Sequence, residues 1–159
     1  MNKLHQYDTI VTWKGNLGNG TDTYRTYSRD HEITINGKPA LFGSSDSAFR
    51  GDPSRHTPED LLVSSIAGCH LLWYLHLCAV NGVLVLAYAD HAHGRMQENE
   101  DGSGQFTAVT LKPRVAVAAK SMTEKARTLH TDAHRMCFIA RSVNFPVTVI
   151  PEIVWDEQV

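Results

Sequence analysis

Three cysteines are the residues of this sequence best suited to nucleophilic or redox chemistry. Cys69 lies in a long apolar stretch, Cys78 follows nine residues later, and Cys137 lies in a second helical pattern. Their number is odd, their spacing is wide and none forms a C-x-x-C pair, so the disulfide framework of a small secreted domain is not expected. Such cysteines are core residues, catalytic thiols or metal ligands. Cys78 is predicted to be a core residue, because unpaired cysteines are commonly buried.

A reactive cysteine needs a cation nearby, because the thiolate is the nucleophile and an unperturbed thiol is mostly protonated at neutral pH. Arginines precede the apolar stretch, and the carboxylate of Glu59 can hold one of them through bidentate hydrogen bonds. The usual arginine is a solvated surface charge, so the residue pattern alone leaves the choice open. The candidates are Arg25, Arg29, Arg50 and Arg55.

A histidine-rich segment offers a different chemistry. His130, His134 and Cys137 follow the pattern H-x-x-x-H-x-x-C, and histidines four residues apart on a helix can face the same metal. His91 and His93 alternate along a predicted strand and can add a fourth ligand. The chain has nine histidines, so one such pair arises readily by chance. The predicted site therefore contains no metal and no cofactor, and metal binding is kept as an alternative.

Length and charge favour one soluble domain over residues 1–159. The net charge of −2, without a basic stripe, argues against nucleic-acid binding. The first residues lack a secretory signal pattern, so a cytoplasmic location is expected. Residues 61–80 carry no formal charge and are long enough to span a bilayer, but no Lys or Arg cluster flanks them. A helix buried inside a domain or a dimer is the preferred interpretation, and no membrane association is expected.

The N-terminal third is predicted to be an antiparallel β-meander. The strongest hairpin signal is Asn36-Gly37, which is flanked by two short strand patterns. Residues 44–56 are polar and contain Gly and Pro, which is typical of a loop. The predicted strands are residues 7–13, 21–28, 32–35 and 40–43.

Two helices and three strands complete the predicted α+β fold. The first helix begins with Thr57 as N-cap and Pro58 in the first turn, and Asn81-Gly82 ends it. The second begins at Ser121, which forms a capping-box pattern with Glu124, and its apolar face continues to Ala140. The predicted strands are residues 83–97, 105–118 and 146–155; the first two form a hairpin, and the last contains Pro151.

Two segments carry a resemblance to a known family. The run TPEDLLVSSIAGCHLLWYL places a cysteine ten residues after the glutamate of the helix start, and AHRMCFIARSV places a second cysteine near the end of the second helix. Both resemble the motifs of the OsmC/Ohr family of organic hydroperoxide reductases. The order of strands and helices is also similar along essentially the whole chain. One difference is Phe138, which follows the second cysteine where the family often has proline.

The resemblance implies an OsmC-like fold of antiparallel β-sheets around a long central helix, in an intertwined homodimer with active sites at the subunit interface. It also implies residue roles. Cys69 would be the peroxidatic thiol, Cys137 the resolving thiol, and Glu59 the carboxylate that orients an arginine. Arg50 is the first choice for that arginine, and Arg29 is the substitute.

The sequence thus predicts a thiol peroxidase that reduces organic hydroperoxides through a Cys69 sulfenic acid and a Cys69–Cys137 disulfide. The family suggests that a dithiol reductant, such as a lipoyl-bearing protein or a small thiol, reopens the disulfide. Apolar neighbours, including Trp73, Tyr74 and Phe49, favour an organic hydroperoxide over hydrogen peroxide. The alternatives are a metal- or small-molecule-binding module on the same fold, and a redox sensor whose disulfide rarely recycles.

Overall fold

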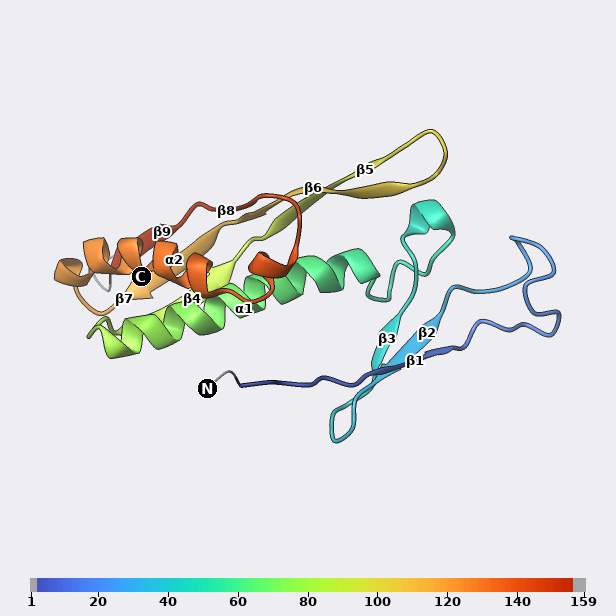
Figure 1. Cartoon of the computed structure of the whole chain (residues 1–159), viewed down its shortest axis with the longest axis horizontal. Helices are drawn as coiled ribbons and strands as arrows, with labels where there is room; N and C mark the ends of the chain where they lie inside the picture. Colours follow the sequence, from blue (N-terminus) through green and yellow to red (C-terminus); the bar gives the residue numbers. More distant parts are fainter. Residues whose placement is uncertain (1–2, 156–159) are drawn as a thin grey trace. The chain divides into compact units, whose positions relative to one another are not determined.

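The computed structural model describes residues 3–155 and divides the chain into two compact units (Figure 1). The first unit ends at Leu61 and the second begins at Leu62. The first contains a small sheet and a long loop, and the second contains two sheets, most of helix α1 and the whole of helix α2. Helices and strands are thus combined as the sequence predicts, in an α+β fold.

The first unit holds a three-stranded antiparallel sheet in the order β1–β2–β3. Its strands are β1 (Ile10–Trp13), β2 (His31–Thr34) and β3 (Leu41–Gly43). The turn between β2 and β3 places Gly37 at φ 75°, a left-handed conformation that glycine adopts without the steric cost of a Cβ atom. The predicted meander and its Asn36-Gly37 hairpin are confirmed.

The strand predicted over residues 21–28 is wrong, because this segment forms turns and bends. Its alternating threonines bond locally instead of facing a neighbouring strand. The Thr26 hydroxyl donates to the carbonyl oxygen of Thr23 at 3.0 Å and accepts from the Thr23 N–H at 3.0 Å. Short polar side chains compete with the β ladder in this way, and a periodic pattern does not reveal it.

Helix α1 (Pro58–Val80) begins and ends where the sequence predicts. The Thr57 hydroxyl accepts from the Asp60 N–H at 3.1 Å, and the Asp60 carboxylate accepts from the Thr57 N–H at 3.0 Å. This reciprocal capping satisfies two backbone donors at the first turn. At the other end Gly82 takes φ 72°, which stops the helix.

One side of α1 is buried, and the opposite side is exposed in the single chain. The buried side chains recur every four residues at Ile66, His70, Tyr74 and Cys78. The prediction for Cys78 is confirmed, since it belongs to the core. Large apolar side chains on other sides are exposed, among them Leu72, Leu75 and Val80.

By length and composition, α1 is also apolar enough to cross a membrane, the one such helix among residues 3–155. Core helices of soluble proteins share this property, so it is weak evidence for a membrane span.

The second unit contains two three-stranded sheets, in the orders β4–β7–β9 and β5–β6–β8. The two long strands predicted over residues 83–97 and 105–118 each divide in two: the first forms β4 and β5, and the second forms β6 and β7. The predicted hairpin is therefore formed by β5 and β6, and β4 pairs with β7 beyond it. At the division, the Asp90 carboxylate accepts from the Lys112 N–H at 2.7 Å. The strands are β4 (Val85–Asp90), β5 (His93–Glu98), β6 (Gly104–Leu111) and β7 (Pro113–Val117).

The last predicted strand also divides, into β8 (Val147–Val149) and β9 (Glu152–Trp155). Pro151 lies between them, where its missing N–H costs no ladder hydrogen bond. The two strands pair in parallel with β6 and β7 respectively. The sheets of this unit are therefore mixed and not purely antiparallel.

Helix α2 (Thr123–Met136) differs from its prediction at both ends. Ser121 lies in a 3-10 turn (Lys120–Met122), and the helix begins without a side-chain cap, so the predicted capping box with Glu124 does not form. At the other end, Cys137 is extended with ψ 108°, so Ala140 lies beyond the helix, in a second 3-10 turn (Ala140–Ser142).

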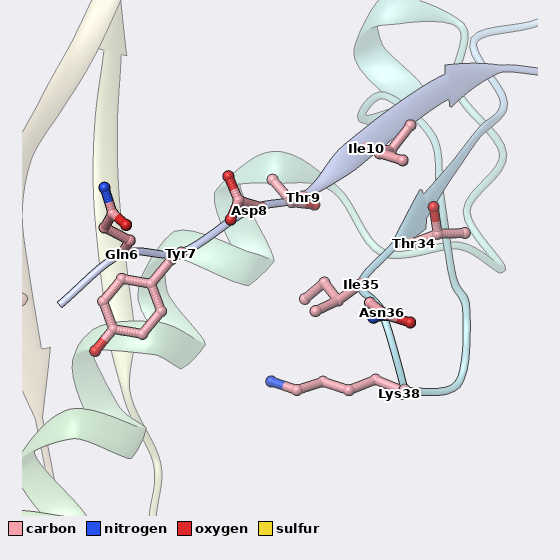
Figure 2. Close-up of a pocket in the computed structure, with 10 residues that line it drawn as sticks. Gln6, Tyr7, Asp8, Thr9, Ile10, Thr34, Ile35, Asn36 and Lys38 are labelled. Atoms are coloured by element: carbon pink, nitrogen blue, oxygen red, sulfur yellow. The ribbon is translucent and has the colours of Figure 1, made fainter.

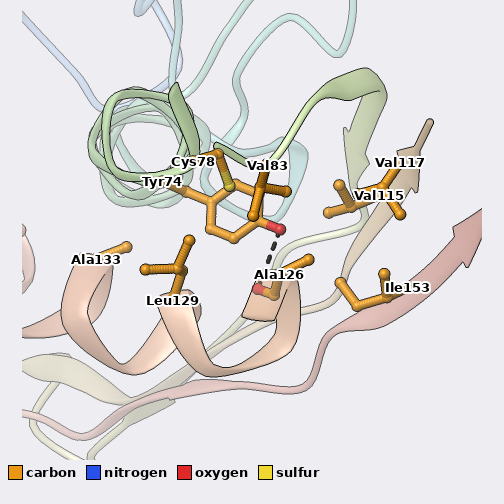
Figure 3. Packing of buried hydrophobic residues seen from close by; sticks show 9 residues of the cluster. All are labelled: Tyr74, Cys78, Val83, Val115, Val117, Ala126, Leu129, Ala133 and Ile153. Atoms are coloured by element: carbon orange, nitrogen blue, oxygen red, sulfur yellow. Dashed lines mark hydrogen bonds between the residues drawn. The ribbon is translucent and has the colours of Figure 1, made fainter. Parts of the chain in front are cut away.

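The second unit has two apolar cores, and α1 contributes to both. Ile66 packs with Val109 and Leu111 of β6. The larger core joins α1 and α2 to β7 and β9 (Figure 3). Its buried members are Tyr74, Cys78, Val83, Val115, Val117, Ala126, Leu129, Ala133 and Ile153.

Candidate functional site

The side chains of Cys69 and Cys137 lie beside each other in the second unit, close enough for Cys69 to raise the pKa of Cys137. Cys69 projects from the middle of α1 and is partly exposed, whereas Cys137 is fully buried directly after α2. The Cys137 sulfur also accepts from the Ala140 N–H at 3.4 Å and lies 4.0 Å from the carbonyl oxygen of Ile66, to which it donates. The two cysteines are 68 positions apart in the sequence, and the fold brings their thiols into contact.

The surroundings of the two thiols are unequal. Burial, together with the neighbouring Cys69 thiol, raises the pKa of the Cys137 thiol, and the Ala140 N–H only partly opposes this effect. Cys137 therefore keeps its proton at neutral pH and is shielded from solvent. Cys69 is the thiol that a molecule in solution can reach.

Cys69 opens onto an apolar cleft of about 400 Å³. Two aromatic rings form one wall, since the Trp73 ring meets the Phe138 ring edge to face at a centroid distance of 5.6 Å. His76 is the polar side chain at this cleft, and its ring lies 5.9 Å from that of Trp73. The lining residues are Cys69, Leu72, Trp73, His76 and Phe138.

Of the aromatic neighbours expected for the thiol, Trp73 lines the cleft, whereas Tyr74 points into the core. Phe49 belongs to the first unit, and its place beside the thiol stays a prediction. Leu72 and His76 were missed, although positions 69, 72, 73 and 76 follow the i, i+3, i+4, i+7 spacing of one helical face. That spacing was a signal that could have found them.

The predicted partners of the thiol, Arg29 and Glu59, line a cleft of about 310 Å³ in the first unit. The Arg29 guanidinium donates to the carbonyl oxygens of Tyr27 at 2.6 Å and Tyr24 at 2.7 Å, and it stacks over both rings at 4.2 Å. These contacts hold the guanidinium in one place. Within residues 3–155 no ion pair closer than 4.0 Å joins Glu59 to an arginine.

Arg50 does not line this cleft. It is exposed and takes φ 65° at the end of a 3-10 turn (Ser47–Phe49). Arg55 is occupied elsewhere, in ion pairs with Asp30 at 3.5 Å and Asp52 at 3.3 Å. Within the first unit, Arg29, the substitute choice, thus shares a cleft with Glu59, and Arg50 does not.

A wider cavity of about 1020 Å³ lies in the first unit between residues 6–10 and the turn at residues 34–38 (Figure 2). Its walls are an extended segment and a hairpin turn, and Figure 2 shows Tyr7, Ile35 and Lys38 beside it. No cysteine or histidine lines it. The thiol chemistry therefore lies elsewhere.

The histidines of α2 do not converge on a metal position. His130 Nδ1 lies 2.9 Å from Nε2 of His70 on α1, so its ring faces another imidazole. Among residues 3–155, no group of three His, Cys, Asp or Glu side chains is arranged to hold a metal ion. His91 and His93 are exposed. The metal-binding alternative gains no support.

His70 and His130 form a buried pair of stacked rings with a centroid distance of 5.3 Å. Burial lowers the pKa of His70 to about 4, and His134 adds to the shift. Burial, followed by the charges of His70 and Arg127, lowers the pKa of His130 to about 3. Both imidazoles are therefore neutral at neutral pH.

Comparison with known proteins places the chain among OsmC-like structures. The model of the OsmC-like protein family matches residues 51–152. The OsmC-like protein of unknown function VCA0330 from Vibrio cholerae is 29% identical, with a TM-score of 0.83 over 94% of this chain and 100% of that one. A search of the curated proteins gave no match.

Two organic hydroperoxide resistance proteins share the fold at lower identity. The protein from Elizabethkingia anophelis is 14% identical, with a TM-score of 0.69 over 98% of this chain and 100% of that one. OhrB of Bacillus subtilis is 19% identical, with a TM-score of 0.62 over 95% of this chain and 99% of that one.

The buried histidine pair predicts a loss of stability in acid. Both pKa values are lowered from 6.5, so between pH 6.5 and about 4 the unfolded chain binds protons that the folded chain does not. The free energy of unfolding should be greatest above pH 7 and fall as the pH falls through this window. Urea unfolding at pH 7 and pH 4.5 measures the loss.

In the double variant His70→Leu/His130→Leu this loss should be smaller, by about 2 kcal/mol or more, because a shift of one pKa unit corresponds to about 1.4 kcal/mol. His93→Gln is the control, since its ring is exposed in the folded chain. An equal loss in the wild type and the leucine variant would contradict the assignment.

Proposed function

The chain belongs to the OsmC-like protein family, and on that premise we propose that it is a thiol peroxidase for organic hydroperoxides. The observation that carries the proposal is the contact between a solvent-reachable thiol, Cys69, and a buried thiol, Cys137. Some proteins of the same fold are organic hydroperoxide resistance proteins, which supports the same chemistry.

In the first step, the Cys69 thiolate attacks one peroxide oxygen and the O–O bond breaks. The sulfur is oxidised to a sulfenic acid, and the organic oxygen leaves with a proton as an alcohol. The open side of Cys69 supports its role as the attacking thiol. The burial of Cys137 supports a role that needs no contact with the substrate.

In the second step, the Cys137 sulfur attacks the sulfenic sulfur of Cys69. The S–O bond breaks, the hydroxyl group leaves with the Cys137 proton as water, and a disulfide forms. The raised pKa of Cys137 suits this order, because a protonated thiol does not compete for the peroxide. An external dithiol, such as a lipoyl-bearing protein, then reduces the disulfide by thiol–disulfide exchange.

The cleft beside Cys69 supports an organic substrate. Leu72, Trp73 and Phe138 give it an apolar lining that an alkyl or aryl group fills better than water does. Hydrogen peroxide has no group that gains from this surface, so the preference is for hydroperoxides with an apolar body.

Activation of Cys69 is proposed to depend on Arg29, the substitute choice of the resemblance, in place of Arg50. Hydrogen bonds to two carbonyl groups and stacking on two tyrosines hold the guanidinium in a fixed position. Glu59 lines the same cleft of the first unit as Arg29, and its carboxylate can orient the arginine. A fixed cation stabilises a thiolate better than a mobile one.

A homodimer is proposed as the functional assembly. In the single chain, α1 exposes large apolar side chains, among them Leu72, Leu75 and Val80. A second copy of this helix presents the same surface, so packing the two together would remove both from water.

The first prediction of this proposal concerns the two thiols. With a dithiol reductant, the wild type should consume cumene hydroperoxide, and Cys69→Ser should abolish consumption. Cys137→Ser should form the sulfenic acid once and then overoxidise, because no second thiol traps it. Peroxide consumption and mass spectrometry measure both outcomes, with Cys78→Ser as the matched control. A wild type with no turnover in any dithiol would refute the proposal, whereas disulfide formation with poor recycling would indicate a sensor.

The second prediction separates the two arginines. Arg29→Met should slow the reaction of Cys69 with cumene hydroperoxide by about tenfold or more, since each unit by which the thiol pKa rises removes about tenfold of the thiolate. Arg50→Met, an equal change at an exposed position, should have little effect. Stopped-flow kinetics of the reduced protein measures both rates. A slower reaction in Arg50→Met with an unchanged rate in Arg29→Met would instead assign the activation of Cys69 to Arg50.

The third prediction concerns the assembly. Leu75→Glu should convert a dimer to monomers in analytical ultracentrifugation, because it buries a charge in the proposed interface. Thr128→Glu adds the same charge on the exposed side of α2 and should leave the dimer intact. A wild type that sediments as a monomer at high concentration would rule the dimer out.

A further inference from the structure

We propose that the buried His70–His130 pair is a positioning contact that holds helix α1 and helix α2 in the one register at which the two thiols meet. The inference rests on the proposed function for the use made of the disulfide. The positioning itself is a statement about geometry, and it is testable without a peroxide.

Among residues 3–155, three side-chain polar contacts join α1 to α2 or to Cys137 directly after it, and we call them the polar ladder. The Tyr74 hydroxyl donates to the carbonyl oxygen of Ala126 at 3.1 Å (Figure 3). One turn earlier on α1 and one turn later on α2, His70 Nε2 lies 2.9 Å from His130 Nδ1.

The third rung lies at the thiols. The Cys137 sulfur donates to the carbonyl oxygen of Ile66 and contacts the side chain of Cys69. Along α1 the rungs fall at positions 74, 70 and 66, while on the other side they rise from 126 and 130 on α2 to 137, directly after its end. The two helices therefore run in opposite directions, and one register satisfies all three rungs.

The contact between the two histidines constrains the relative orientation of α1 and α2 as well as the distance between them. The two rings are nearly parallel, with an interplanar angle of 8°, and Tyr74 stacks on His130 at 3.8 Å. Both imidazoles are fully or almost fully buried, and their outer nitrogens, Nδ1 of His70 and Nε2 of His130, have no hydrogen-bond partner.

That incomplete pairing indicates what the rung contributes. In either tautomeric arrangement one imidazole donates and the other accepts, so one buried N–H stays unpaired at a cost in stability. Two leucines would fill this space without that cost. The specific contribution of the pair is therefore a directional contact that apolar side chains do not provide.

A disulfide is sensitive to such a constraint. The Cα atoms of a disulfide pair must lie about 4.4–6.8 Å apart with suitable directions, and a shift of one residue along a helix moves a side chain by about 1.5 Å and turns it by about 100°. His70 is the residue next to Cys69, and His130 lies about two turns before Cys137. Their hydrogen bond thus fixes Cys69 on α1 relative to the end of α2, which Cys137 directly follows.

The test measures the effective concentration of the two thiols, as the equilibrium of the Cys69–Cys137 disulfide with reduced and oxidised glutathione at pH 7. Mass spectrometry quantifies the linkage, and thermal unfolding of each variant is recorded beside it. In His70→Leu/His130→Leu the effective concentration should fall tenfold or more. In His70→Gln/His130→Asn it should stay within threefold of wild type, because the amide groups reach the positions of Nε2 and Nδ1.

Tyr74→Phe is the matched control, because it removes the rung farthest from the thiols. It should lower the melting temperature while leaving the effective concentration within threefold. If the histidines had a merely structural role, their loss and the loss of the Tyr74 hydroxyl would change the effective concentration alike. If the leucine pair does not fold, His70→Asn replaces it, because its amide is too short to reach His130, and it should lose effective concentration where His70→Gln does not.

Two results would overturn the positioning role: wild-type effective concentration in the folded leucine or His70→Asn variant, or an equal loss in Tyr74→Phe. A wild type that forms no disulfide with glutathione would also overturn it. A wild type that forms the disulfide but consumes no cumene hydroperoxide would refute the proposed function and leave the positioning role standing.

Discussion

The packing of helix α1 along its buried stripe is the interaction on which the second unit depends. Ile66 joins one core, and Tyr74 and Cys78 join the other. The same stripe carries His70, which contacts α2. Cys69 therefore stands on an element that is fixed from two directions, and its position is determined by the whole unit and not by a loop. A reactive group on a rigid helix is held more precisely than one on a mobile segment.

The proposed chemistry depends on an asymmetry between two identical functional groups. Both thiols lie at the same helix contact, but one faces an apolar cleft and the other faces the protein interior. Burial keeps the inner thiol protonated and out of reach, so in the proposed reaction the order in which the two thiols act follows from their surroundings. This inequality supports the proposed two-step reaction of a pair of cysteines.

The features that depend on local sequence were predictable. Thr57 and Asp60 cap α1, and Gly37 turns the first hairpin, because each acts on residues within a few positions. The failures depend on partners far along the chain. Nothing near β8 shows that it pairs in parallel with β6, and nothing near Ser121 shows that a 3-10 turn displaces its capping box.

In the candidate site, too, the features that the sequence could not predict depend on residues far apart in the chain. The resemblance supplied the pairing of Cys69 with Cys137, which residue spacing alone could not. The contact of His70 with His130 spans 60 positions and left no signal in either helix. The sequence also could not show that Arg29, and not Arg50, shares a cleft with Glu59, since the two arginines look alike in it.

The place where α2 ends has a further consequence. Cys137 lies between the last helical residue and the 3-10 turn at Ala140, so its backbone is extended and belongs to neither. Forming a bond to Cys69 then requires a change in a short connector, while α2 and the sheets behind it keep their hydrogen bonds. The oxidised and reduced forms would differ in this connector and in the Phe138 wall of the cleft that it carries. A reductant that has to distinguish the oxidised protein from the reduced one would meet this difference at the surface, because Phe138 is exposed.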